Sequence, residues 1–124
     1  MAKWHRQDRL GNEIKKVLSD VISTGIKDPI LTERMITITE VRVSEDRSYA
    51  ICFISPFILN GEDRALVNKD VLSAFKRANG MLRTKISKEI RLRHAPKLDF
   101  RIDESEEYGR HIDKLIEGIH KEEK

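Results

Sequence analysis

The most informative stretch for the fold is residues 36–54, ITITEVRVSEDRSYAICFI. In residues 36–43, apolar and polar side chains alternate and most are β-branched, which is typical of a half-buried strand. Residues 44–48 supply turn-forming side chains, and residues 49–54 form a second apolar run. The simplest arrangement of the two runs is an antiparallel hairpin. Cys52 lies within the second run and is expected to be a buried, unreactive thiol.

Helical periodicity appears on both sides of this hairpin. Residues 8–24 place apolar side chains on one helix face, and the helix should end before Asp28-Pro29. A second period of 3.6 residues runs from residue 64 to about 91. Residues 98–102 then alternate like a third strand, and residues 105–120 show the pattern of a final amphipathic helix.

The long helical segment contains one irregularity, Asn79-Gly80. Glycine costs about 1 kcal/mol relative to alanine inside a helix, and asparagine is also a poor helix former. The pair therefore predicts a kink or a break into two helices, with Gly80 at positive φ. A helix that begins after Gly80 would present free N–H groups to a phosphate.

The order of these elements predicts an α+β fold with helices packed on one face of a three-stranded sheet. The 124 residues, with a mass of 14.4 kDa, suffice for one domain. We expect its core at about residues 6–103 and a C-terminal helix at about 105–120. The charged start of the chain leads into no apolar run, so we expect a cytoplasmic protein without a membrane span.

Motifs for catalysis or cofactor binding are missing from the sequence. It contains no phosphate-binding loop, dinucleotide fingerprint or HExxH motif, and its four histidines are dispersed. The single cysteine excludes an internal disulfide and a cysteine-based zinc site. We therefore expect a protein that is not an enzyme and that has no metal or cofactor.

Charge is distributed unevenly along the chain. The net charge is only +3, yet residues 76–97 hold eight Lys or Arg side chains and a single acid, Glu89. Such a segment favours binding to a polyanion, although a basic helix face that merely contacts solvent is the alternative. Because Phe53, Phe75 and Phe100 occupy predicted core positions, we expect contacts to phosphates and not stacking on bases.

Five short motifs in this order resemble those of bacterial ribosome-binding factor A, and the resemblance spans residues 6–119. The motifs are Asp28-Pro29-Ile30-Leu31, residues 36–44 with Asp46, Ala78-Asn79-Gly80 with Arg83, residues 92–100, and Asp103-Glu104-Ser105 leading to Gly109-Arg110. The resemblance implies a type II KH-like domain, α-β-β-α-α-β, in which an Ala-x-Gly kink replaces the usual GxxG loop.

The same resemblance implies a function. Members of this family are non-enzymatic assembly factors that bind the free 30S ribosomal subunit and its 16S rRNA or precursor, and we expect this chain to be a monomer. They promote late maturation of that rRNA, including processing of its 5′ end, and support growth in the cold. The alternative is a KH-like protein-interaction adaptor that does not bind RNA directly.

Charge and position, and not a residue signature of the family, select the candidate RNA-binding residues. Arg83, Lys85 and Lys88 lie off the apolar stripe of their helix and are expected to point outward. The full set of candidates is Arg9, Lys76, Arg77, Asn79, Gly80, Arg83, Lys85, Lys88, Arg91 and Arg93.

Overall fold

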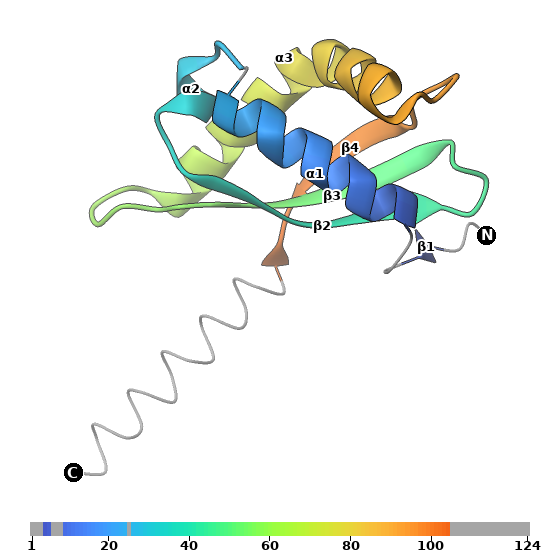
Figure 1. Cartoon of the computed structure of the whole chain (residues 1–124). Coiled ribbons are helices and arrows are strands. Elements are labelled where there is room, and N and C mark those ends of the chain that lie inside the picture. Colours follow the sequence, from blue (N-terminus) through green and yellow to red (C-terminus); the bar gives the residue numbers. More distant parts are fainter. Residues whose placement is uncertain (1–3, 6–8, 25, 105–124) are drawn as a thin grey trace, which may run out of the picture.

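The structure, a computed structural model, describes residues 4–5, 9–24 and 26–104 (Figure 1). The helix expected at residues 105–120 lies outside the described residues. The described elements are, in chain order, β1 (Trp4–His5), α1 (Arg9–Thr24), α2 (Pro29–Thr32), β2 (Ile36–Ser44), β3 (Tyr49–Pro56), α3 (Arg64–Ile90) and β4 (Lys97–Ile102).

The strands form one sheet in the order β1-β2-β3-β4. The predicted hairpin is confirmed, because β2 pairs antiparallel with β3, with Val41 opposite Cys52. The third predicted strand is confirmed as β4, which runs parallel to β3 after the crossover through α3. The two-residue strand β1, which pairs with Val43 and Ser44, adds a fourth strand that the sequence did not indicate. Two residues are too few to show a strand period.

Helices α1 and α3 cover one face of the sheet, as the sequence predicted (Figure 1). The core between them is apolar, and the thiol of Cys52 is fully buried within it. Burial, with a smaller contribution from Asp99, raises the pKa of Cys52 to about 12, so this cysteine stays protonated. The arrangement of helices on one face of this sheet is the KH-like fold that the resemblance implied.

The opposite face of the sheet corrects one prediction. Phe53 was expected in the core, but it lies half-buried on the face away from the helices, with the Arg42 guanidinium 5.0 Å from its ring centre. Phe75 and Phe100 are on the helix side and stack with ring centres 4.5 Å apart. Strand β3 is apolar on both faces, so its sequence does not show which set of alternate residues faces the helices.

Helix α3 corrects the prediction of positive φ at Gly80 and excludes the break, one of the two predicted alternatives, because it continues through Asn79 and Gly80 as one helix of 27 residues. Among the described glycines only Gly61 has positive φ, so Gly80 is helical and no new helix begins there. The helix axis nevertheless changes direction about midway (Figure 1). The Thr84 hydroxyl donates a hydrogen bond of 3.0 Å to the Gly80 carbonyl, a contact that often bends helices. The segment is kinked but not broken.

The positive φ predicted for Gly80 implied that Gly80→Ala would destabilise the protein, and the helical geometry reverses that expectation. A Cβ at Gly80 would have no atom within 4 Å, and the backbone there is helical. The substitution should therefore stabilise the protein by about 0.5–1 kcal/mol. Thermal melting measures the change, and a lower melting temperature would contradict the helical assignment.

Gly11→Ala is the matched control. A Cβ at Gly11 would lie 2.6 Å from the backbone carbonyl oxygen of Val41, so α1 and β2 would have to separate. We expect this variant to melt at a lower temperature than the parent, since overpacking of this kind costs about 1–3 kcal/mol.

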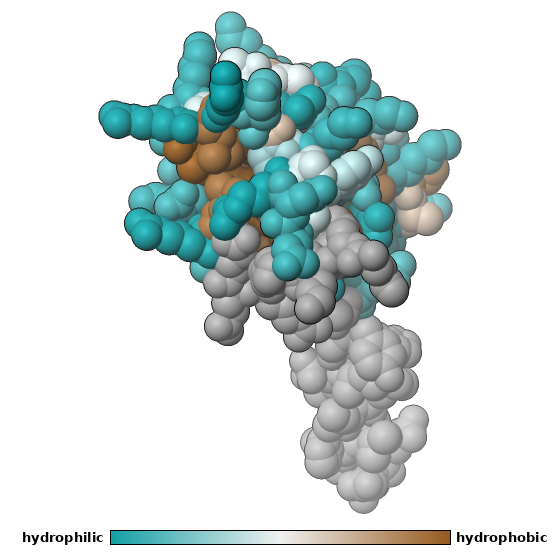
Figure 2. Space-filling model, turned by 90° about the vertical axis from the view of Figure 1, so that its right-hand side faces the viewer, coloured by the Kyte–Doolittle hydropathy of each residue, from teal (hydrophilic) through white to brown (hydrophobic). Residues whose placement is uncertain are grey.

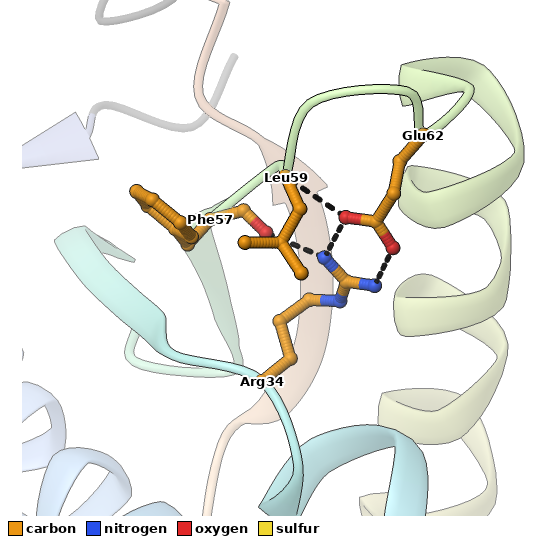
Figure 3. Close-up of polar contacts among 4 residues, drawn as sticks. All are labelled: Arg34, Phe57, Leu59 and Glu62. Carbon is orange, nitrogen blue, oxygen red and sulfur yellow. Dashed lines mark hydrogen bonds and ion pairs between the residues drawn. The ribbon is translucent and has the colours of Figure 1, made fainter.

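An ion pair between Arg34 and Glu62 connects two segments of the chain near α2 (Figure 3). The Arg34 guanidinium donates two hydrogen bonds to the Glu62 carboxylate, at 2.7 and 2.5 Å, and a third to the Phe57 carbonyl. The Glu62 carboxylate also accepts from the backbone N–H of Leu59 at 2.7 Å. Together these contacts tie the segment before β2 to the loop that connects β3 to α3.

The hydrogen bonds from Arg34, and next the one from Leu59, lower the pKa of Glu62 to about 2. Since this pKa lies below its value in the unfolded chain, the pair stabilises the fold fully above about pH 4.5 and ceases to do so as the pH falls toward 2.

Glu62→Gln should therefore be less stable than the parent at pH 7, and the difference should shrink as the pH approaches 2. Denaturant unfolding at several pH values measures it. A difference that stays constant with pH would show that the Glu62 charge is not responsible.

Candidate nucleic-acid interface

The predicted RNA-binding residues Asn79 and Arg83 serve the fold of the chain itself. They lie one helical turn apart on α3 and face the segment that leads into β4. The Asn79 side-chain amide donates to the Leu98 carbonyl at 3.1 Å. The Arg83 guanidinium donates to the carbonyls of Ala95 and Pro96, at 2.9 and 3.2 Å. The expectation that Arg83 points outward is therefore wrong.

The segment held by these bonds begins with an unusual helix end. Arg91 follows α3 with φ 59° and ψ 44°, a left-handed conformation that usually belongs to glycine. The backbone N–H groups of Arg91 and Leu92 both donate to the Ser87 carbonyl, which completes the last turn. The chain then leaves the helix with Arg91 and Arg93 exposed, whereas Ala95 and Pro96 are buried.

The same segment lies beside the turn of the β-hairpin. The Lys97 N–H donates to the Ser48 carbonyl at 2.9 Å, which joins the start of β4 to the turn between β2 and β3. That turn carries Arg47, which is exposed and has φ 63°. Arg47 and Arg91 are the two residues other than glycine that have positive φ in the part of the chain the structure describes.

Together these contacts gather exposed cations at one end of the molecule. We call this surface the basic end and define it by Arg47, Lys88, Arg91, Arg93 and Lys97. Figure 2 views the molecule from this side, where hydrophilic side chains surround small hydrophobic areas. Glu45, Asp46 and Glu89 are the neighbouring acids, so the basic end keeps an excess of positive charge.

The other candidates do not join the basic end. Arg77 forms an ion pair of 3.0 Å with Asp28, whose side chain also accepts from Ile30 at the start of α2. Arg9 lies at the start of α1, 3.4 Å from Glu13. Lys85 lines a groove against α1, and Lys76 is exposed in the middle of α3.

Sequence reasoning missed two residues of the basic end, Arg47 and Lys97. Arg47 is 29 or more residues away from the basic segment along the chain, and only the pairing of β3 with β4 brings it close. The sequence does predict a turn at residues 44–48. It does not show that this turn lies beside the start of β4, because that depends on the parallel register of β3 and β4.

No group of three or more His, Cys, Asp or Glu side chains in residues 4–5, 9–24 and 26–104 is arranged to hold a metal ion. None of the helices described is long and apolar enough to cross a membrane.

Comparison with known proteins gives a consistent result. The family model of ribosome-binding factor A matches residues 6–116. The ribosome-binding factor A of Desulfitobacterium hafniense is 41% identical over 99% of this chain and 92% of its own length.

Solved structures also resemble this chain. The crystal structure of ribosome-binding factor A from Thermus thermophilus has a TM-score of 0.61 and 26% identity, covering 75% of this chain and 91% of that one. A homology model of the Thermus protein, fitted into a cryo-EM map of its complex with the 30S subunit, has a TM-score of 0.58 and 26% identity, covering 76% and 91%. From the family match, the high coverage and the shared fold, we conclude that this chain belongs to the ribosome-binding factor A family.

Proposed function

We propose that this chain binds the free small ribosomal subunit through phosphates of its 16S rRNA. The observation that carries the proposal is the basic end, where one loop, one turn and the last turn of α3 present five exposed cations. The 30S complex of the Thermus relative supports the choice of partner. Membership of a ribosome-binding factor family supports a role in ribosome assembly.

The contacts expected at this surface are electrostatic. Lys and Arg side chains neutralise phosphates and release the counterions that surround RNA, so affinity falls as salt rises. If each of the five cations of the basic end meets one phosphate, the slope of log K against log salt should be about −4 to −5. The rigid anchoring of the loop by Asn79 and Arg83 lowers the entropy that the loop would lose on binding.

We further propose that binding assists late maturation of the subunit, including processing of the 5′ end of 16S rRNA, and supports growth in the cold. The chain contributes binding energy to this process and no catalytic group. It acts as a monomer in the cytoplasm.

Removal of charge from the basic end tests this proposal. Lys88→Gln/Arg93→Gln/Lys97→Gln replaces three exposed side chains, so the variant should fold with nearly the melting temperature of the parent. Its salt slope with 16S rRNA should fall by about 2–3, and its co-sedimentation with isolated small subunits should be strongly reduced.

A variant with the same loss of charge provides the control. Lys16→Gln/Lys27→Gln/Lys69→Gln changes exposed lysines on α1, before α2 and early in α3. It should bind small subunits like the parent. Equal loss of binding in both variants would show diffuse attraction by net charge. Binding of small subunits that does not depend on salt in the parent would favour the protein-interaction adaptor.

A further inference from the structure

An exposed aromatic ring lies at the basic end. Tyr49 is the first residue of β3, and 45% of its surface is exposed. Phe57 is also exposed and follows the far end of the same strand. We propose that an unpaired nucleotide of the bound RNA stacks its base on the ring of Tyr49. This inference rests on the proposed function and adds a base contact to the phosphate contacts.

The charges around Tyr49 suit a nucleotide. Lys97 is its partner residue across the parallel pair of β3 and β4, and Arg47 precedes it by two residues. Farther along the same open face of the sheet the cations are neutralised, because Arg42 pairs with Glu40 at 2.9 Å and Arg101 pairs with Asp99 at 2.8 Å. Among residues 36–56 and 97–102, the cations on this face without an ion-pair partner are therefore those beside Tyr49.

The backbone beneath the ring is held firmly. The Tyr49 N–H donates to the Ser44 hydroxyl at 3.0 Å, and that hydroxyl donates to the Asp46 carboxylate at 2.8 Å. Asp46 also accepts from the N–H and the hydroxyl of Ser48, at 3.1 and 2.7 Å. These bonds lower the pKa of Asp46, with Ser48 the largest cause, and occupy one of its carboxylate oxygens.

The second acid in this turn, Glu45, is exposed and would repel a phosphate placed next to it. The phosphate of the stacked nucleotide therefore lies on the side of Lys97, away from the tip of the turn. A stable platform of this kind loses little entropy when a base stacks on it.

A stacking contact predicts that single-stranded RNA and duplex RNA bind differently. Bases within a duplex are already stacked on their neighbours, so only an unpaired base can lie against the ring. Loss of one base–aromatic stack weakens binding by about 5- to 100-fold. Loss of the Tyr49 ring removes no cation, so it should leave the salt slope unchanged, in contrast to the loss of a lysine.

The test compares Tyr49→Leu with Tyr49→Trp, using a single-stranded RNA oligonucleotide, an RNA duplex and isolated small subunits. Tyr49→Leu should weaken binding of the single strand by about 5- to 100-fold with an unchanged salt slope, and should leave duplex binding as in the parent. Tyr49→Trp should retain binding. Phe57→Leu is the matched control and should bind like the parent. Tyr49→Thr, which suits a strand, replaces Tyr49→Leu if that variant does not melt cooperatively.

The possible outcomes separate this inference from the proposed function. If Tyr49→Leu binds the single strand like the parent while Lys88→Gln/Arg93→Gln/Lys97→Gln does not, the stacking site is refuted and the phosphate contacts stand. If Tyr49→Leu weakens single strand and duplex equally, its effect is on the basic end as a whole and the stacking site is again refuted. If neither variant weakens binding of small subunits, the proposed function itself fails.

Discussion

The hydrogen bonds from Asn79 and Arg83 hold the start of β4 and the segment before it against α3. They join α3 to the carbonyls of Ala95, Pro96 and Leu98, and they fix where the chain returns to the sheet. Bonds from a charged guanidinium are stronger than neutral ones, and all three accepting residues are buried. Asn79 and Arg83 thus stabilise the fold, whereas Lys88, Arg91 and Arg93, which follow them in the chain, remain exposed.

Helix α3, which carries Asn79 and Arg83, is itself bent (Figure 1). A helix of 27 residues would be about 40 Å long if straight, which is longer than any strand of this sheet. Both halves of α3 contribute to the core, with Phe75 in the first half and Leu82 and Ile86 in the second, all fully buried. The hydrogen bond from the Thr84 hydroxyl to the Gly80 carbonyl is a contact of the kind that bends helices. The bend therefore needs no positive φ and no break.

Much of the fold could be predicted from the sequence, because alternation and helical spacing are set by burial on one face. The hairpin, α1 and β4 were found in this way, and Asn79-Gly80 marked the place of the bend. Phe53 was misplaced because β3 is apolar on both faces. The outward direction of Arg83 was wrong because its partners are backbone carbonyls, which leave no trace in a residue pattern. Arg47 was missed because it lies at the basic end only through the parallel register of β3 and β4.

The central claim is that the basic end faces 16S rRNA, and site-specific cross-linking tests it most directly. A photoreactive side chain placed at residue 93, in the exposed loop, is compared with one at residue 69, on the exposed early part of α3. Both full-length proteins are bound to isolated small subunits and irradiated. The account predicts cross-links to 16S rRNA from residue 93 and few or none from residue 69. Cross-links to rRNA from residue 69 alone would contradict it.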